Sequence, residues 1–386
     1  MKKTLLFAFV LFTGTFTTLN AQTWTAQTSG TSAGLSSVHF SSPTKGWAVG
    51  SSGVIIHTND GGTTWSSQSS GVGSSTHLSD VHFVDGLTGF AVGTANTILK
   101  TTDGINWSGV TLGAPGTVNL TAVWVDASTV RIAGDMGIYA STSNWGSSWS
   151  PNTTGALNAA DIEFVGLNGW LVDQIGNILK TTNGGSSWST QVSGFSAGLN
   201  SISFIDQNEG WIAGNSGLIL HTTDGGANWN AQTTGITTTI HSIYFASSTH
   251  GWATSGGNVL STTNGGTTWT IQTGVSTSNL LSIYFPSTTI GYAVAGNGSV
   301  YKFTGSSLDL EENTTNTVSI YPNPATDFLT IDTKEAIETI EIYSNLGQLV
   351  KTETATNFSI ADLNSGVYFV HVTTEKGKSI TRLVKE

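Results

Sequence analysis

One short phrase with the residue types of a reactive site recurs along the chain. Its first copy is "TNDGGTTW" at residues 58–65, where an aspartate, two glycines and a tryptophan lie close together. An aspartate in such a loop could act as a general acid or base, hold a hard cation, or shape a turn. Further copies end at Trp107, Trp149, Trp188, Trp229 and Trp269. The copies can therefore be compared within one chain.

The third position of the phrase decides between these chemistries. It alternates between two amino acids: Asp60, Asp103, Asn144, Asn183, Asp224 and Asn264. Asparagine cannot replace aspartate as an acid, a base or a strong ligand for a hard cation. Both side chains can accept a hydrogen bond from a backbone N–H two residues further on, which forms an Asx turn, and the glycines allow a positive φ. The six residues are predicted to shape structural turns.

Other groups that could do chemistry are sparse. The chain has no cysteine, which excludes thiolate sites and disulfides, and its eight histidines show no spacing typical of a metal site. With 13 lysines and arginines against 24 acids, the net charge of −11 argues against a nucleic-acid partner. We predict no catalytic residue, no metal and no cofactor.

The elements that position the turns repeat about every forty residues. Successive closing tryptophans are 42, 42, 39, 41 and 40 residues apart. Each unit has three alternating apolar runs before the turn and a fourth after it, as in "LSSVHF", "GWAVG", "VIIHT" and "WSSQSSG". Four short strands per unit are typical of a propeller blade, and there are seven units. The predicted fold class is all-β: a seven-bladed β-propeller followed by a small, Ig-like β-sandwich.

The ends of the repeat array predict how the ring closes. The seventh unit lacks the turn phrase and the fourth strand, whereas residues 24–29, "WTAQTS", form a fourth strand with no unit before it. We expect this segment to complete the seventh blade, so that no sheet edge is exposed. An open solenoid is the alternative, but it needs capping repeats, which the sequence does not show.

One position of the innermost strand varies while its neighbours stay apolar, as expected for the lining of a central channel. Its occupants are His39, His82, Trp124, Glu163, Ser203, Tyr244 and Tyr284. Mixed aromatic and polar groups suit contact with a peptide or a glycan, so these are the candidate ligand contacts, with simple filling of the channel wall as the alternative. Asp80 and Asp161 also lie on innermost strands. Because two carboxylates roughly 6.5–9.5 Å apart suffice for an inverting glycosidase, a secreted hydrolase is the alternative function.

The pattern Ser/Thr-x-Asp-x-Gly-x-x-Trp resembles the Asp box, or BNR repeat, of sialidases and related propellers. Together with "GWAVG", it is similar to the photosystem II assembly and stability factor family of plastids and cyanobacteria, over about residues 22–305. The Asp-box resemblance implies structural hairpins at the rim, away from any site. Sialidase chemistry would need an arginine triad. The propeller region holds one arginine, Arg131, at a position that is aromatic in the other units.

Both ends of the chain carry expected targeting segments. Residues 1–21 combine Lys2 and Lys3 with the apolar run "TLLFAFVLF" and end at Ala21, as in a secretory signal peptide. The run is too short to span a bilayer, so we expect no transmembrane segment. We predict a propeller over residues 22–305, a polar linker over 306–317 and a separate β domain over 318–386.

The last domain resembles the type A C-terminal sorting domain of the Bacteroidetes type IX secretion system. The matching residues are Pro322, Asn323, Pro324, Gly347, Leu363, Gly366, Tyr368 and the basic tail through Lys385. The resemblance implies that the chain is secreted or held on the cell surface after removal of the signal peptide and the sorting domain. It also argues against photosystem assembly, because it implies a non-photosynthetic bacterium.

The sequence therefore predicts an exported, non-enzymatic binding propeller. Its expected partners are the type IX secretion machinery and an unknown extracellular protein or glycan.

Overall fold

The computed structural model describes residues 23–113, 116–156, 158–305, 318–333, 336–344, 349–374 and 377–386. By its internal contacts the chain divides into two compact units, Met1–Ser306 and Ser307–Glu386. The signal peptide expected over residues 1–21, the linker expected over 306–317 and Gly347 of the sorting motif lie outside the described residues.

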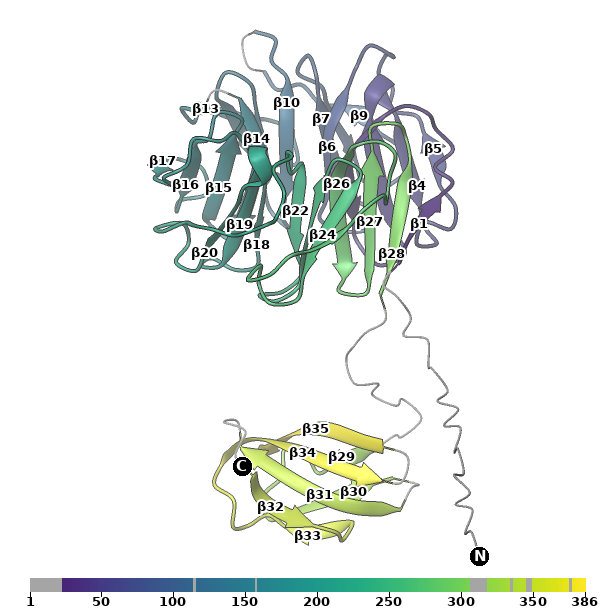
Figure 1. Cartoon of the computed structure of the whole chain (residues 1–386), viewed down its shortest axis with the longest axis vertical. Coiled ribbons are helices and arrows are strands. Elements are labelled where there is room, and N and C mark those ends of the chain that lie inside the picture. Colours follow the sequence, from purple (N-terminus) through teal and green to yellow (C-terminus); the bar gives the residue numbers. More distant parts are fainter. Residues whose placement is uncertain are drawn as a thin grey trace, which may run out of the picture. The chain divides into compact units, whose positions relative to one another are not determined.

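Seven four-stranded antiparallel sheets make up the first unit (Figure 1). The first sheet contains β2 (Leu35–Phe40), β3 (Gly46–Gly50), β4 (Ile55–Thr58) and β5 (Ser66–Gln68). The second contains β6 (Leu78–Phe83), β7 (Gly89–Gly93), β8 (Ile98–Thr101) and β9 (Ser108–Gly109). The third contains β10 (Leu120–Val125), β11 (Val130–Gly134), β12 (Ile138–Thr142) and β13 (Ser150–Thr153). The next three are β14 (Ala159–Val165), β15 (Asn168–Asp173), β16 (Ile178–Thr181) and β17 (Ser189–Gln191); β18 (Leu199–Phe204), β19 (Gly210–Gly214), β20 (Ile219–Thr222) and β21 (Asn230–Ala231); and β22 (Ser242–Phe245), β23 (Gly251–Ser255), β24 (Asn258–Thr262) and β25 (Thr270–Gln272).

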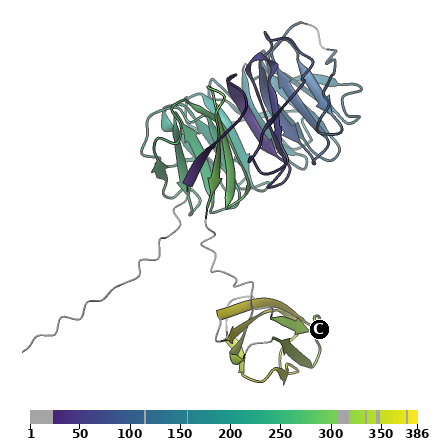
Figure 2. The ribbon, with the colours of Figure 1, turned by 90° about the vertical axis from the view of Figure 1, so that its right-hand side faces the viewer.

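The seventh sheet joins the two ends of the propeller. It contains β26 (Leu280–Ser287), β27 (Ile290–Ala295), β28 (Val300–Thr304) and β1 (Thr23–Gln27), and Figure 2 shows the purple β1 beside this last green blade. Trp24 lies opposite Phe303 in the register, and their ring centroids are 5.3 Å apart. Each innermost strand contacts the next, and β26 contacts β2, so the ring is closed. The predicted closure by the N-terminal strand is confirmed.

Stacked aromatic rings hold neighbouring blades together. Trp47 of the first blade lies parallel to Phe83 of the second, with 3.5 Å between ring centroids, and Trp107 meets the same Phe83 edge-on at 5.7 Å. The phenylalanine needs a glycine beside it, because a Cβ at Gly89 would lie 2.5 Å from its ring. In the "GW" of the first blade, the glycine thus leaves room for the phenylalanine ring of its own blade, and the tryptophan that follows stacks on the phenylalanine of the next blade.

The third blade makes this junction with a cation. The Arg131 guanidinium carbon lies 4.1 Å from the ring centroid of Phe164 in the fourth blade, where other blades place an aromatic ring. Arg131 is only 4% exposed, and its Nη1 donates to Asp126 Oδ2. The residue that departs from the repeat therefore keeps a flat group on the next phenylalanine.

The second unit is a small β-sandwich. One sheet holds β29 (Ser319–Tyr321), β30 (Phe328–Asp332) and β33 (Asn357–Ser359), and the other holds β32 (Leu349–Glu353), β31 (Ile337–Ser344), β34 (Gly366–Thr374) and β35 (Gly377–Lys385). Leu329 and Ile331 from the first sheet pack with Ile340, Ile342 and Val370 from the second in one buried cluster. The predicted all-β class, a propeller followed by a sandwich, is confirmed.

Most of the sorting motif that the structure describes gathers around the last strand. Pro322 and Pro324 flank Asn323, whose Oδ1 accepts a hydrogen bond from Val384 N at 2.9 Å. Ala325 forms a parallel bridge with Lys385 in β35. Gly366, at the start of β34, lies opposite this same lysine, and the Tyr368 hydroxyl donates to Asn364 O at 2.9 Å.

Candidate functional site

Each Asp-box turn is organised by hydrogen bonds within the box. Asp60 Oδ1 accepts from Thr58 Oγ1 and from Thr64 N, both at 2.9 Å, and Asp60 Oδ2 accepts from Thr64 Oγ1 at 2.7 Å. In the third blade Asn144 Oδ1 accepts from Ser148 N at 2.9 Å, whereas Asn144 Nδ2 donates to Ser148 Oγ at 2.8 Å. Aspartate and asparagine thus exchange by reversing the direction of one hydrogen bond, which a rotating hydroxyl permits.

In five copies the box side chain accepts a hydrogen bond from a different backbone N–H than predicted. The backbone N–H that the side chain accepts lies four residues further on, not two, because two box residues with positive φ, such as Gly61 and Gly62, lengthen the loop. The second blade has a shorter box, and there Asp103 accepts from the N–H groups of Ile105 and Asn106. Among the six box residues, Asp103 alone accepts from the N–H two residues further on, as predicted.

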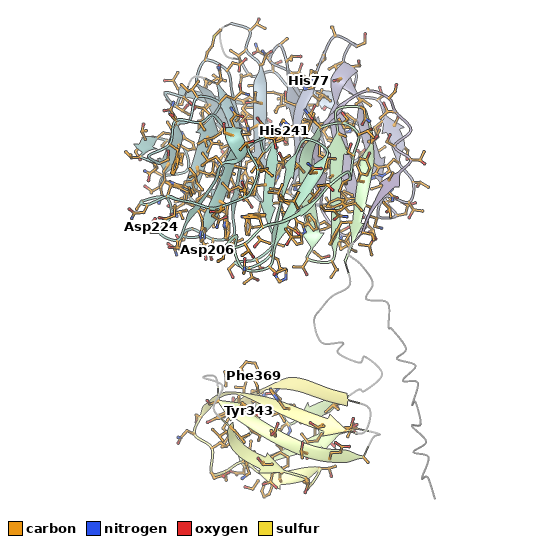
Figure 3. All side chains as sticks on the ribbon, viewed as in Figure 1. His77, Asp206, Asp224, His241, Tyr343 and Phe369 are labelled. Atoms are coloured by element: carbon orange, nitrogen blue, oxygen red, sulfur yellow. The ribbon has the colours of Figure 1, made fainter. Side chains whose placement is uncertain are left out.

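The box residues lie on the surface, far from a setting that would tune an acid for catalysis. All six are exposed, and Asp224 lies at the rim of the propeller (Figure 3). Hydrogen bonds from Thr64 lower the pKa of Asp60 to about 2, and those from Asn228 lower the pKa of Asp224 to about 2. A general acid near neutral pH needs the opposite shift.

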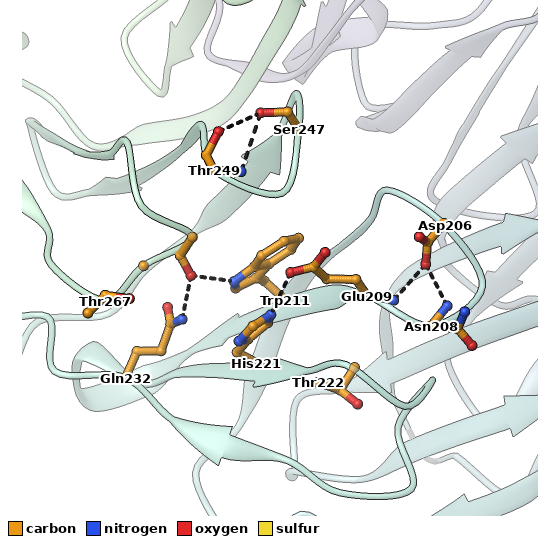
Figure 4. Close-up of polar contacts among 12 residues, drawn as sticks. Asp206, Asn208, Glu209, Trp211, His221, Thr222, Gln232, Ser247, Thr249 and Thr267 are labelled. Atoms are coloured by element: carbon orange, nitrogen blue, oxygen red, sulfur yellow. Dashed lines mark hydrogen bonds and ion pairs between the residues drawn. The ribbon is translucent and has the colours of Figure 1, made fainter. Parts of the chain in front are cut away.

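The boxes also join neighbouring blades, through a carbonyl that the sequence analysis did not consider. Figure 4 shows one case, in which Trp211 Nε1 and Gln232 Nε2 of the fifth blade share one acceptor, Gly265 O of the next box, at 3.2 and 2.8 Å. Trp47 Nε1 donates to Gly104 O at 2.9 Å in the same manner. The signal available in the sequence was the pairing of "GW" in the first, fourth and fifth units with a box glycine one unit later.

A cavity of about 250 Å³ occupies the centre of the propeller and is lined by the innermost strands of all seven blades. Every candidate contact predicted from the sequence lines it: His39, His82, Trp124, Glu163, Ser203, Tyr244 and Tyr284. A smaller cavity of about 120 Å³ shares Asp80 and Asp161 with it. The structure thus brings the seven predicted residues together in one layer of one wall.

Five members of this layer form a continuous series of rings. The successive centroid distances are 4.9, 4.6, 4.4 and 4.5 Å along Tyr244, Tyr284, His39, His82 and Trp124. Glu163 and Ser203 complete the layer. We name these seven residues the channel ring. One arc of it is aromatic, and the remaining arc is acidic and polar.

A second layer of the wall was not predicted as a layer. It lies two residues earlier in each innermost strand and consists of Ser37, Asp80, Ala122, Asp161, Ser201, Ser242 and Ser282. Six of these seven residues line the central cavity, and Ala122 does not line it.

The polar groups of this second layer tie each blade to the next. Asp161 Oδ2 accepts from Ile202 N of the fifth blade at 3.0 Å, and Ser201 Oγ accepts from Ile243 N of the sixth at 3.2 Å. In the channel ring, Glu163 Oε2 accepts from Phe204 N at 2.8 Å in the same way. Serine and carboxylate therefore serve one structural role. Their exchange at one repeat position was the signal, of the same kind as the Asp/Asn exchange in the boxes.

Burial controls the charge of the cavity. Loss of solvation raises the pKa of Asp80 to about 6 and, with the nearby charge of Asp80, raises the pKa of Asp161 to about 7. The pKa of Glu163 is raised well above its usual value, mainly by burial. Burial also lowers the pKa of His82 to about 4 and that of His39 well below its usual value. Burial thus favours the neutral form of both the imidazoles and the carboxyls. Among the described residues, no group of three or more His, Cys, Asp or Glu could hold a metal ion.

Comparison with known families identifies both units. Residues 16–160 and 152–234 match the family of photosynthesis system II assembly factor YCF48. The chain belongs to this family. Residues 319–386 match the secretion system C-terminal sorting domain, so both resemblances found in the sequence are confirmed. This domain indicates a protein that is secreted or displayed at the cell surface. No curated protein matches the chain, and no helix among the described residues is long and apolar enough to cross a membrane.

Solved structures share the propeller fold. YCF48 from Cyanidioschyzon merolae is 23% identical, with 73% of this chain and 98% of that chain covered and a TM-score of 0.62. YCF48 bound to D1 peptide is 22% identical, with 75% and 97% covered and a TM-score of 0.65. PorZ, an essential bacterial surface component of the type-IX secretion system of Porphyromonas gingivalis, is 16% identical, with 93% of this chain and 60% of that chain covered and a TM-score of 0.56. At these identities the likeness shows the fold alone.

Proposed function

We propose that this chain is a non-enzymatic propeller that acts outside the cell and binds a segment of a partner protein in its central cavity. The observation that carries the proposal is the channel ring, in which a series of aromatic rings faces one cavity of about 250 Å³. Aromatic side chains supply large contact areas at a small entropic cost, which suits recognition of a peptide. The family member solved with a D1 peptide supports a peptide over a glycan as the ligand.

The sorting domain supplies the route of delivery in this proposal. The type IX secretion machinery would recognise residues 318–386 and carry the folded propeller past the outer membrane, after a signal peptide has taken the chain across the inner one. PorZ, with a similar propeller, is a surface component of that system, which supports an extracellular role. Whether the mature propeller is released or retained then depends on the partner that it binds.

A secreted glycoside hydrolase is the second candidate, favoured by the three carboxyls of Asp80, Asp161 and Glu163 around one cavity. Each of them, however, already accepts a backbone N–H from the next blade, at 2.8, 3.0 and 2.8 Å respectively. Serine takes the same role in other blades, for example Ser201 and Ser203. These bonds explain the acids without catalysis.

Arrays of peptides and glycans, probed with the purified full chain, test the proposal. We expect peptide binding that Trp124→Ala weakens and that Leu167→Ala, an exposed control outside the cavity, leaves unchanged. Glycan binding without peptide binding would favour the glycan alternative. Release of reducing sugar from polysaccharides, lost in Glu163→Gln, would establish the hydrolase instead.

A further inference from the structure

The channel ring has features that favour one sign of charge. Its aromatic arc consists of five adjacent rings that line the cavity, with neighbouring ring centroids no more than 4.9 Å apart. Aromatic faces attract a cation placed against them, and the attraction grows when the site is desolvated. The opposite arc contributes Glu163, the acid of the ring. Both arcs therefore favour a positively charged group in the cavity.

Glu163 has capacity left for such a group. Among the described residues, Phe204 N is the one hydrogen-bond donor to this carboxyl, through Oε2. The second oxygen, Oε1, is available to a ligand. An ionised carboxyl in a buried site is stabilised by a positive charge beside it, so the entry of a cation would favour the charged form of Glu163.

We propose that the central cavity binds the ammonium group of a lysine side chain in the partner segment, between the aromatic arc and Glu163. This inference rests on the proposed function. A lysine ammonium carries three donors on a compact charge, one of which can go to Glu163 Oε1, and its methylene stem can pack on the rings. A guanidinium needs a planar pair of acceptors instead. The described residues offer no cluster for a metal cation.

Proton release accompanies this binding. In the empty cavity burial raises the pKa of Glu163 and so favours its protonated form. A bound ammonium lowers that pKa, so affinity rises with pH until the carboxyl is ionised without the ligand. The other titratable groups around Glu163 are Asp161 on its own strand, Tyr244 and Tyr284 across the ring, and Asp80, His39 and His82 on the remaining wall. Asp80 and Asp161 add to the same trend, whereas the tyrosines stay neutral over this range.

The test compares peptides selected on the array, each made with lysine, Nε-acetyl-lysine, norleucine or arginine at one position. Titration calorimetry with the full chain should show that acetylation or norleucine weakens binding at least about tenfold, and that arginine binds more weakly than lysine. Glu163→Gln keeps an oxygen for Phe204 N, so it should retain the melting temperature but lose the preference for lysine and much of the pH dependence between pH 5 and 8. Equal affinity for the lysine and acetyl-lysine peptides would overturn the inference while leaving peptide binding, and so the proposed function, intact.

A second probe distinguishes failure of the proposed function from failure of the ammonium site. If no peptide on the array binds, the proposed function fails, and capped lysine (Nα-acetyl-lysine methylamide) then tests the cavity directly. Binding that is lost in Glu163→Gln would support the ammonium site. No binding of capped lysine, where its acetylated analogue is the control, would reject the site together with the proposed function.

Discussion

Replacing Asp161 with serine should make the propeller more stable at high pH and leave it nearly unchanged at low pH. Serine occupies the same position in other blades, where Ser201 Oγ accepts the next blade's N–H at 3.2 Å. A serine at position 161 can therefore keep the hydrogen bond from Ile202 N. What it removes is a carboxyl whose pKa burial and the charge of Asp80 raise to about 7.

The size and sign of the effect follow from the linkage between protonation and folding. An unfolded aspartate has a pKa of about 4, so folding shifts this group by roughly three units, which corresponds to up to about 4 kcal/mol. Because the folded state holds the proton more tightly, the group costs nothing below about pH 4, and its cost grows as pH rises towards 7. The difference in unfolding free energy between Asp161→Ser and wild type should therefore increase by up to about 4 kcal/mol from pH 4 to pH 8.

Urea unfolding of the full chain at several pH values measures this difference. All thirteen tryptophans lie between Trp24 and Trp269, so their fluorescence reports on the propeller alone. Asp161→Ala is the matched control: it removes the same titration but also the inter-blade acceptor, so it should lie about 1–2 kcal/mol below Asp161→Ser at every pH. A difference between Asp161→Ser and wild type that stays constant from pH 4 to pH 8 would show that Asp161 is not a strained buried acid.

Three further perturbations test other parts of the molecule. Deleting residues 24–29 should lower the melting temperature of the propeller, because the seventh blade loses its outer strand and the contact of the partly buried Trp24 with Phe303, and an unchanged melting curve would contradict closure by β1. Asp60→Asn should leave stability unchanged, since an asparagine can donate to Thr64 as Asn264 donates to its own threonine, whereas Asp60→Ala should cost about 1 kcal/mol in urea unfolding. Deleting residues 318–386 should leave a folded propeller in the periplasm of a host with type IX secretion; equal amounts of truncated and full-length protein outside the cell would reject the sorting role.

The fold could be predicted in detail because the chain repeats itself. Seven copies of one unit allow each position to be compared with six others, which separates residues kept for packing from those free to vary. The Asp/Asn exchange at positions such as 60 and 144 predicted a turn, and the unmatched strand at Trp24 predicted closure. The variable position on the innermost strand likewise identified the residues that line one cavity.

Contacts between blades could not be predicted in the same way. Which backbone N–H meets Asp161 or Glu163 depends on the register between sheets about forty residues apart, and no local pattern encodes it. The hydrogen-bond partners of the box side chains were predicted wrongly for a related reason, since the positive φ at Gly61 and Gly62 decides which backbone N–H donates to Asp60. Raised pKa values in the cavity follow from burial, which the acids' sequence neighbours do not reveal.

Arg131 departs from the repeat, and the structure gives this departure a role in packing and not in ligand binding. In other blades one tryptophan both stacks on the next phenylalanine and donates to a box carbonyl, as Trp170 does with Phe204 and with Gly225 O at 3.0 Å. The third blade divides these tasks: Arg131 covers Phe164, and the Tyr139 hydroxyl donates to Gly184 O at 3.1 Å. The guanidinium is buried and paired with Asp126, so it is committed to the fold and cannot clamp the carboxylate of a ligand. The described residues that line the central cavity include no lysine or arginine, and this is the condition under which aromatic rings and a carboxyl favour a cation from a partner.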